Sequence, residues 1–233
     1  PELPLTAAEK AHIARQPKGV AATFREIWAA IVEMPEAMRK LAVMSLFQWS
    51  AMAAYWGYVI YSIGRSVYQT SDPTSDGFRS SVLANGEMAA FYNCIAFFAA
   101  FALVPFTKRF GPAVVHAVCL SLAGLGMTAL PHIESKWMLF MPAVGVGLGW
   151  ASIMGNPYVI LAGSIPPERT GVYMGIFNMM IVIPMLLIAA TLPFFYNPLM
   201  GGDPRNVLTL SGILMFCAAL AVLRARDEGR TIG

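Results

Sequence analysis

Residues 166–184 of the chain, PPERTGVYMGIFNMMIVIP, decide the fold. This stretch opens on a charged turn, continues as an apolar run that contains Asn178, and reaches a proline at position 184. In a water-soluble core, an unpaired amide and a proline inside a helix both leave polar groups without hydrogen-bond partners. A membrane-spanning helix that faces a polar cavity tolerates both. The stretch therefore favours a membrane span beside a water-accessible cleft.

The composition of the whole chain indicates a membrane protein. Hydrophobic residues make up 57% of the 233 residues and charged residues only 12%, whereas charged residues are about a quarter of a soluble domain. A helix needs about 20 apolar residues to cross a bilayer. Six charge-free windows come close to or exceed this length, so we predict an all-α integral membrane protein built as a bundle of six transmembrane helices. The windows are 41–64, 88–107, 110–133, 137–167, 170–202 and 206–223. The fourth and fifth windows exceed the bilayer, so we expect loops at their ends.

The segments that flank the bundle are charged. We interpret 1–40 as a cytoplasmic linker, 41–223 as the transmembrane bundle and 224–233 as a cytoplasmic tail. Apolar residues at helical spacing from Phe24 to Val32 predict an amphipathic helix on the inner membrane surface or across the bundle, ended or kinked at Pro35. The first forty residues contain no long apolar run, so no signal peptide is expected. Because the chain begins with Pro rather than Met, we interpret it as a piece of a longer protein.

The distribution of positive charge orients the bundle. The other Lys and Arg residues fall on the side of the two termini, and the opposite side carries Arg65, Arg79, Lys136 and Arg205. By the positive-inside rule, both termini are expected in the cytoplasm, with the bundle in the cell (inner) membrane. The segment 65–87, which is rich in Ser, Asp, Gly and Thr, predicts a long irregular outer loop. Because the basic residues are scattered over several loops, no nucleic-acid partner is expected.

The sequence carries no recognisable catalytic or metal-binding motif. Cys94, Cys119 and Cys217 fall in separate apolar windows and are interpreted as small hydrophobic residues, so neither a disulfide framework nor a metal site is predicted. The GVGLGW run at 145–150 precedes no phosphate-facing helix start, and its glycines are interpreted as points of close helix packing. No triad, paired carboxylates or His-x-x-x-His spacing occurs, so we expect neither an enzyme nor a cofactor.

A few polar side chains interrupt the apolar windows and are the candidate site residues. Gln48 and Tyr55 fall on one helical stripe of the first window, where amide and aromatic groups together suit a sugar. Helix packing is the alternative interpretation of this stripe. The complete set of candidate substrate-binding residues is Gln48, Tyr55, Asn93, Asn156 and Asn178.

Two ionisable residues, Glu87 and His116, lie next to or inside the windows. Glu87 is the one outer carboxylate that continues directly into an apolar window, which makes it the candidate for proton or cation coupling. The alternative is an acidic residue in the first turn of a helix, where the helix dipole stabilises it. His116 in the third window is interpreted as a hydrogen-bonded structural residue.

Three stretches resemble a known family. GVYMGIFNMMIVIP at 171–184 resembles a segment of the sucrose transporters and of the wider glycoside-pentoside-hexuronide:cation symporter group of the major facilitator superfamily. Its matching residues are Gly175, Asn178, Ile181, Val182, Ile183 and Pro184. VPFTKRFG at 104–111 is similar to the short basic loop of that superfamily. MPEAMRKLAVMSLFQW at 34–49, followed by Gly64 and Arg65, is similar to the beginning and end of the first helix in the second half of these transporters.

The resemblance covers residues 34–223 and implies the C-terminal six-helix half of a twelve-helix sugar:cation symporter that works by alternating access. It implies that the first, second, fourth and fifth helices line the cleft, where the five candidate residues hydrogen-bond the sugar or each other. The cytoplasmic gate would be formed by Lys108, Arg109, Glu168 and Arg169. The implied partners are the lipid bilayer, a disaccharide or glycoside, a proton or sodium ion, with the proton favoured, and the N-terminal half of the same protein.

Two alternatives stay open. One is a non-transporting membrane sensor or scaffold with the same fold. The other is a major-facilitator carrier of another small solute. An organic anion is disfavoured as that solute, because no Lys or Arg lies in the middle of any apolar window.

Overall fold

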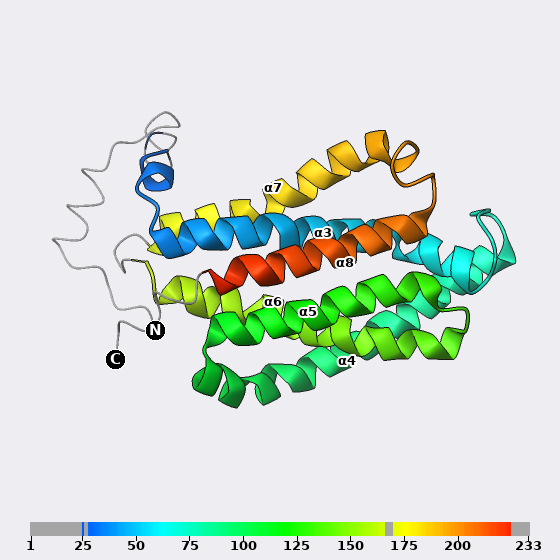
Figure 1. The fold of residues 1–233 in the computed structure, drawn as a ribbon, viewed down its shortest axis with the longest axis horizontal. Coiled ribbons are helices and arrows are strands. Elements are labelled where there is room, and N and C mark those ends of the chain that lie inside the picture. The colour runs from blue at the N-terminus through cyan, green and yellow to red at the C-terminus, as the bar shows by residue number, and fades with distance from the viewer. Residues whose placement is uncertain (1–24, 26–27, 166–169, 225–233) are drawn as a thin grey trace, which may run out of the picture.

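The computed structural model describes residues 25, 28–165 and 170–224, and all regular structure in these residues is helical. This confirms the all-α prediction. Two short 3-10 helices, η1 (Leu130–His132) and η2 (Lys136–Leu139), link the third and fourth long helices. The long helices are α3 (Glu36–Ser66), α4 (Asp76–Phe110), α5 (Pro112–Ala129), α6 (Phe140–Ala162), α7 (Thr170–Tyr196) and α8 (Pro204–Leu223), as Figure 1 shows.

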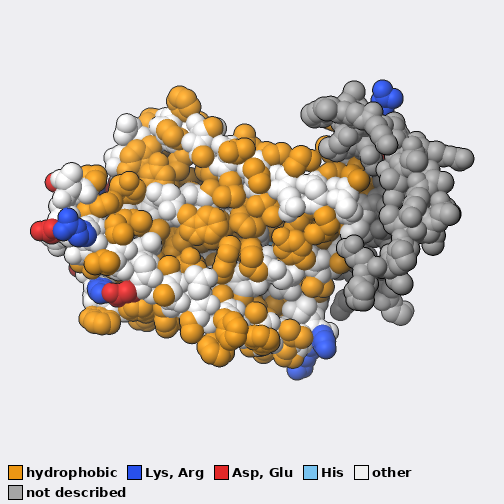
Figure 2. All heavy atoms as spheres, turned by 180° about the vertical axis from the view of Figure 1, so that it is seen from behind, with side chains coloured by type: hydrophobic (Ala, Val, Ile, Leu, Met, Phe, Trp, Pro, Cys, Tyr) orange, Lys and Arg blue, Asp and Glu red, His pale blue; other side chains and the backbone are white. Residues whose placement is uncertain are grey.

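Five of the described helices are long and apolar enough to cross a membrane. The first span is α4, the second is α5 together with η1, the third is η2 together with α6, and the last two are α7 and α8. Their most apolar stretches have a mean hydropathy of 1.5 to 2.2. α3 is 31 residues long but less apolar, because it carries Trp, Tyr and Gln side chains and a charged beginning. On the face seen in Figure 2, the charged side chains lie towards the two ends of the molecule and hydrophobic side chains cover the middle. These features are compatible with a multi-pass membrane protein.

The helices pair in a two-fold pattern. α3 packs against α7 and α8, α6 packs against α4 and α5, and α5 packs against α8; these five pairings are the most extensive in the described bundle. If each helix in these pairs is replaced by its counterpart, with α3 exchanged for α6, α4 for α7 and α5 for α8, the same five pairs result. The described bundle therefore consists of two three-helix units with corresponding contacts.

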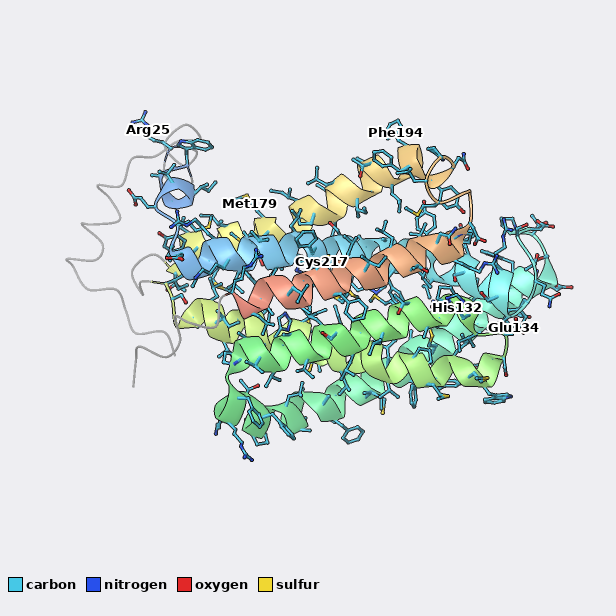
Figure 3. The ribbon with its side chains drawn as sticks, viewed as in Figure 1. Arg25, His132, Glu134, Met179, Phe194 and Cys217 are labelled. Carbon is cyan, nitrogen blue, oxygen red and sulfur yellow. The ribbon has the colours of Figure 1, made fainter. Side chains whose placement is uncertain are left out.

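α4 and α7, which correspond in this exchange, are the least covered of the apolar helices. In their most apolar stretches only 11% and 22% of the residues are buried, compared with 44% to 61% in the stretches of α5, α6 and α8. Phe194 near the end of α7 is 77% exposed and points away from the bundle, as Figure 3 shows. α4 and α7 therefore present broad apolar faces that no described helix covers.

The glycine run of α6 allows close approach to helices on two sides. A Cβ atom on Gly145 would collide with the backbone carbonyl oxygen of Leu122 on α5. A Cβ atom on Gly147 would lie 2.6 Å from the carbonyl oxygen of Tyr92 on α4. Because residues two apart on a helix point to nearly opposite sides, alternate glycines serve the two interfaces. This confirms the interpretation of the run as a site of close packing.

The prediction of an irregular loop over 65–87 is wrong for most of its length. α3 continues to Ser66 and α4 already begins at Asp76, so the connection is only 67–75. The Oγ atom of Ser75 accepts a hydrogen bond from the backbone N–H of Phe78 at 3.1 Å. This N-cap satisfies a free donor of the first turn and lets the helix extend beyond the apolar window. The turn itself lies in the residues before the N-cap, where the backbone N–H of Thr74 donates a hydrogen bond to the Asp72 carboxylate at 2.9 Å.

The boundaries near α3 and α6 follow the sequence signals more closely. Residues 28–32 are helical, the chain is irregular at Pro35, and α3 begins at the next residue. Phe24 and Ile27, two of the apolar residues that predict the amphipathic helix, lie outside the described residues, so that helix stays a prediction. α6 ends at Ala162 and α7 at Tyr196, which confirms that the two longest windows include non-helical ends.

Candidate functional site

A buried histidine joins three helices. The Nε2 atom of His116 on α5 lies 2.9 Å from Oε1 of Gln48 on α3. Its Nδ1 atom lies 2.8 Å from Oγ of Ser152 on α6. Both ring nitrogens therefore have partners, which confirms the interpretation of His116 as a hydrogen-bonded residue.

The hydrogen bonds continue to a fourth helix. The Asn156 amide, one turn beyond Ser152, donates to the Ser152 hydroxyl at 2.7 Å. The Thr107 hydroxyl on α4 donates to the Asn156 side-chain oxygen at 3.2 Å. We name these five side chains the polar chain: Gln48, His116, Ser152, Asn156 and Thr107. It links α3, α5, α6 and α4.

The polar chain has one consistent direction of donation. The carbonyl oxygen of Gln48 can only accept, so Nε2 of His116 carries the hydrogen. In a neutral ring Nδ1 then accepts from the Ser152 hydroxyl, and the Ser152 oxygen accepts from Asn156. Donation thus runs from Thr107 on α4 to Gln48 on α3. This tautomer is assigned from the hydrogen-bond partners.

The polar chain is sealed from the surface except at one end. Its four members from Gln48 to Asn156 are at most 5% exposed, whereas Thr107 is partly exposed. Thr107 immediately precedes Lys108 and Arg109 in the last turn of α4. The open end of the chain therefore lies beside the basic turn that connects α4 and α5.

Two buried hydroxyl groups on α3 lack hydrogen-bond partners among the described residues. They belong to Ser45 and Tyr55, which are 0% and 1% exposed. Both lie on the face of α3 that carries Gln48, at steps of three and seven residues. A buried hydroxyl without a partner costs about 1–3 kcal/mol, and such groups mark places where a water molecule or a ligand supplies the partner. This face of α3 therefore has hydrogen-bonding capacity that the described residues do not use.

Three indole rings connect α3 and α6 near this face. The Trp150 ring on α6 packs edge-on against Trp49 and Trp56 of α3, with centroid distances of 6.4 and 5.6 Å. α3 and α6 otherwise make little contact. Flat rings beside amides and hydroxyls are the groups that bind the C–H faces and hydroxyls of a sugar. Sequence analysis did not single out Trp150, because its partners lie on another helix.

The five predicted substrate-binding residues lie in two different settings. Gln48 and Asn156 belong to the polar chain, and Tyr55 is buried on the same face of α3. Asn93 is exposed on α4, and its amide donates to the carbonyl oxygen of Ala89 in its own helix at 2.8 Å. Asn178 is exposed on α7. The structure therefore brings three of the predicted residues to the inside of the bundle and leaves two on the uncovered helices.

The predicted coupling residue forms an ion pair. The Lys136 ammonium donates to Glu87 at 2.8 Å, and the two side chains are 34% and 48% exposed. Since α4 begins at Asp76, Glu87 does not lie in a first turn, and the alternative interpretation through the helix dipole is wrong. The pair connects α4 to the beginning of η2.

The predicted gate is described only in part. Lys108 and Arg109 are exposed at the end of α4, and the Arg109 guanidinium lies 5.1 Å from the centroid of the Phe110 ring. Glu168 and Arg169 lie outside the described residues.

Within the described ranges no group of His, Cys, Asp and Glu residues is arranged to hold a metal ion. No protein-family model, curated protein or solved structure matches the chain.

Proposed function

We propose that this chain is the C-terminal six-helix half of a secondary active transporter, a sugar:cation symporter of the major facilitator type that works by alternating access. The observation that carries the proposal is the polar and aromatic region between α3 and α6 inside an otherwise apolar bundle. Its Ser45 and Tyr55 hydroxyls, which have no hydrogen-bond partner among the described residues, are the part that a packed structural core would not need.

The pairing of the helices supports a transporter fold. Secondary transporters of this class are built from repeats of three helices within each six-helix half, and the substrate binds near the interface of the repeats. The exchange of α3–α4–α5 with α6–α7–α8 matches such a repeat. The region between α3 and α6 lies between corresponding first helices of the two units. For this proposal α3 is counted as the sixth transmembrane helix.

The uncovered helices support a missing second half. α4 and α7 are the second and fifth helices, which alternating access places against the other half of the carrier. Each carries one exposed amide, Asn93 and Asn178. A polar group that faces hydrocarbon costs several kcal/mol. These amides are therefore expected to face a wet cleft shared with the N-terminal half.

The chemistry of the region favours a neutral solute with many hydroxyl groups. Amides, hydroxyls and indoles surround it, and none of the side chains of the polar chain carries a permanent charge. An anionic solute would need a compensating cation at this depth. A disaccharide or glycoside, driven by a proton or sodium gradient, fits this set of groups. α3 begins and α8 ends at the same end of the bundle (Figure 1). Because most Lys and Arg residues belong to that side, we place it in the cytoplasm and the bundle in the cell membrane.

The test is uptake by the complete protein, including its N-terminal half, in proteoliposomes. We expect labelled disaccharide to accumulate under an inward proton or sodium gradient and not without one. Asn156→Leu and Asn178→Leu should each abolish uptake, while size-exclusion profiles of the purified variants stay unchanged. Sugar binding without flux would favour the sensor alternative. Flux of another solute with no sugar binding would favour a different carrier, and normal uptake in both variants would remove these amides from the site.

A further inference from the structure

We propose that His116 is a proton-binding site of the carrier, and that binding of a proton there releases α5 from α3 and α6. The inference deepens the proposed function, because it assigns a coupling residue within this half of the protein. It starts from the position of His116 at the centre of the polar chain, where each ring nitrogen contacts a different helix.

The ring has no compensating charge in the described structure. α5 and α6 contain no charged residue, and no carboxylate, Lys or Arg side chain of the described residues acts on the imidazole. The Cys119 thiol, three residues further along α5, interacts with the shared Ser152 hydroxyl. The charged residues of the other packed helices are Glu36, Arg39, Lys40 and Arg65 of α3, Asp76, Arg79, Glu87, Lys108 and Arg109 of α4, and Arg205 of α8, and none of them acts on the ring in the closed bundle.

Protonation would reverse one bond of the polar chain, the bond between His116 and Ser152. A charged imidazole donates through both nitrogens, so Nδ1 would donate to the Ser152 hydroxyl instead of accepting from it. The Ser152 oxygen already accepts from the Asn156 amide at 2.7 Å. Its own hydrogen would then need a new acceptor. The present arrangement, in which the Ser152 hydroxyl donates to Nδ1, therefore requires the neutral ring.

The charge would also be unfavourable in the closed bundle. A fully buried cation without a partner costs several kcal/mol, and this cost disappears when the ring reaches water. His116 lies in the second turn of α5, about 6 Å along the axis from the beginning of the helix. The open end of the polar chain, Thr107, lies at the adjoining end of α4. Opening at this corner would expose the ring to water on the side of Lys108 and Arg109.

The consequence is an equilibrium between two states. In the closed state the His116 ring is neutral. In the open state, in which the bundle is open on the α4–α5 side, the ring is protonated. A proton that prefers one state shifts the population towards that state. The same residue would therefore link proton release to closure of the bundle, as a proton-coupled carrier requires.

The direct test is ¹⁵N NMR of the histidine rings in the complete protein, with His116→Gln used to assign the signal. We expect a neutral ring with hydrogen on Nε2 at neutral pH. On acidification the ring should become protonated together with a change in fluorescence of the tryptophans, which include the Trp49, Trp56 and Trp150 group. A ring that stays neutral until the protein unfolds would overturn the inference, and so would protonation without any fluorescence change. These measurements need no transport activity, so their result stands apart from that of the sugar uptake test.

The functional test uses the pH profile of uptake. A single coupled proton gives up to about a tenfold change in rate per pH unit, and His116→Gln should flatten this dependence. Gln keeps a polar group of similar reach, so the variant limits the structural damage. His132→Gln is the matched control, because His132 lies at the far end of α5 in η1 (Figure 3). An unchanged pH profile in His116→Gln would assign the residue a structural role only.

Discussion

Gln48 on α3 and His116 on α5 are hydrogen-bonded at 2.9 Å although 68 residues separate them in the sequence. α3 and α5 make few other contacts, so this bond connects two helices that hydrophobic packing does not hold together. Through Ser152 and Asn156 it continues to α6 and α4. The bond thus makes the position of α3 sensitive to the state of one imidazole ring.

Removing the amide of Gln48 should destabilise the protein. Gln48→Leu leaves the buried Nε2–H of His116 without an acceptor, and an unpaired buried donor costs about 1–3 kcal/mol. The midpoint of thermal unfolding in detergent should therefore fall. Asn93→Leu is the control, because that exposed amide bonds only to its own helix. Equal effects of the two substitutions would show that the interhelical bond does not stabilise the fold.

Tyr55→Phe should separate stability from function. The substitution removes a buried hydroxyl that has no partner among the described residues, so the melting temperature should stay equal or rise. Sugar uptake by the complete protein should fall, because the proposed role of the hydroxyl is to bind the solute. Uptake at the level of the unmodified protein would exclude Tyr55 from the sugar site.

Gly145→Ala should disturb the contact between α5 and α6. The added Cβ atom would meet the backbone of Leu122, which cannot rotate away as a side chain can. Overpacking of this kind costs about 1–3 kcal/mol. Gly155→Ala on the same helix is the matched control, since no atom of the described residues outside its own turn of backbone lies within 4 Å of the added Cβ. Thermal unfolding of the two variants should differ clearly, and equal melting temperatures would contradict the close approach.

Asp203 should make the stability of the α7–α8 connection depend on pH. Its carboxylate accepts from the Arg205 side chain at 2.7 Å and from the Arg205 backbone N–H at 2.9 Å. The Arg205 side-chain bonds hold the pKa of Asp203 below its ordinary value. The bound carboxylate therefore stabilises the fold fully above the ordinary carboxyl pKa of about 3.9, and this contribution disappears as the pH falls through the lowered value.

Asp203→Asn measures this contribution. At neutral pH the variant keeps the N-cap but loses the ion pair with Arg205, so it should be less stable by about 0.2–1 kcal/mol. Its unfolding curve should approach that of the unmodified protein in acid. Asp76→Asn is the control, because the Asp76 side chain is 95% exposed. A stability difference that does not change with pH would contradict the assignment.

Exchange of the charges of Glu87 and Lys136 should distinguish an ion pair from a coupling site. Partly exposed ion pairs contribute about 0.2–1 kcal/mol, so each single reversal should lower stability slightly and the double exchange should restore it. If the pair is only structural, the double exchange also restores uptake. Loss of cation-driven uptake in a stable double variant would support the coupling role of Glu87.

The sequence alone determined that the protein is helical and which stretches are apolar enough for a membrane, because both properties follow from local composition and periodicity. It also indicated the close-packing glycines of α6 and most of the helix ends. The loop over 65–87 was predicted wrongly because the N-cap at Ser75 acts through one side chain, whereas turn residues over a longer stretch suggested irregular structure.

Only the tertiary structure decided which polar residues meet. Gln48, His116 and Ser152 each look like an isolated polar residue in an apolar window, and helix periodicity gives the face of a side chain but not the helix opposite it. The packing of α5 between α6 and α8 brings His116 between Gln48 and Ser152. It also leaves Asn93 and Asn178 outside, because no described helix covers those faces of α4 and α7.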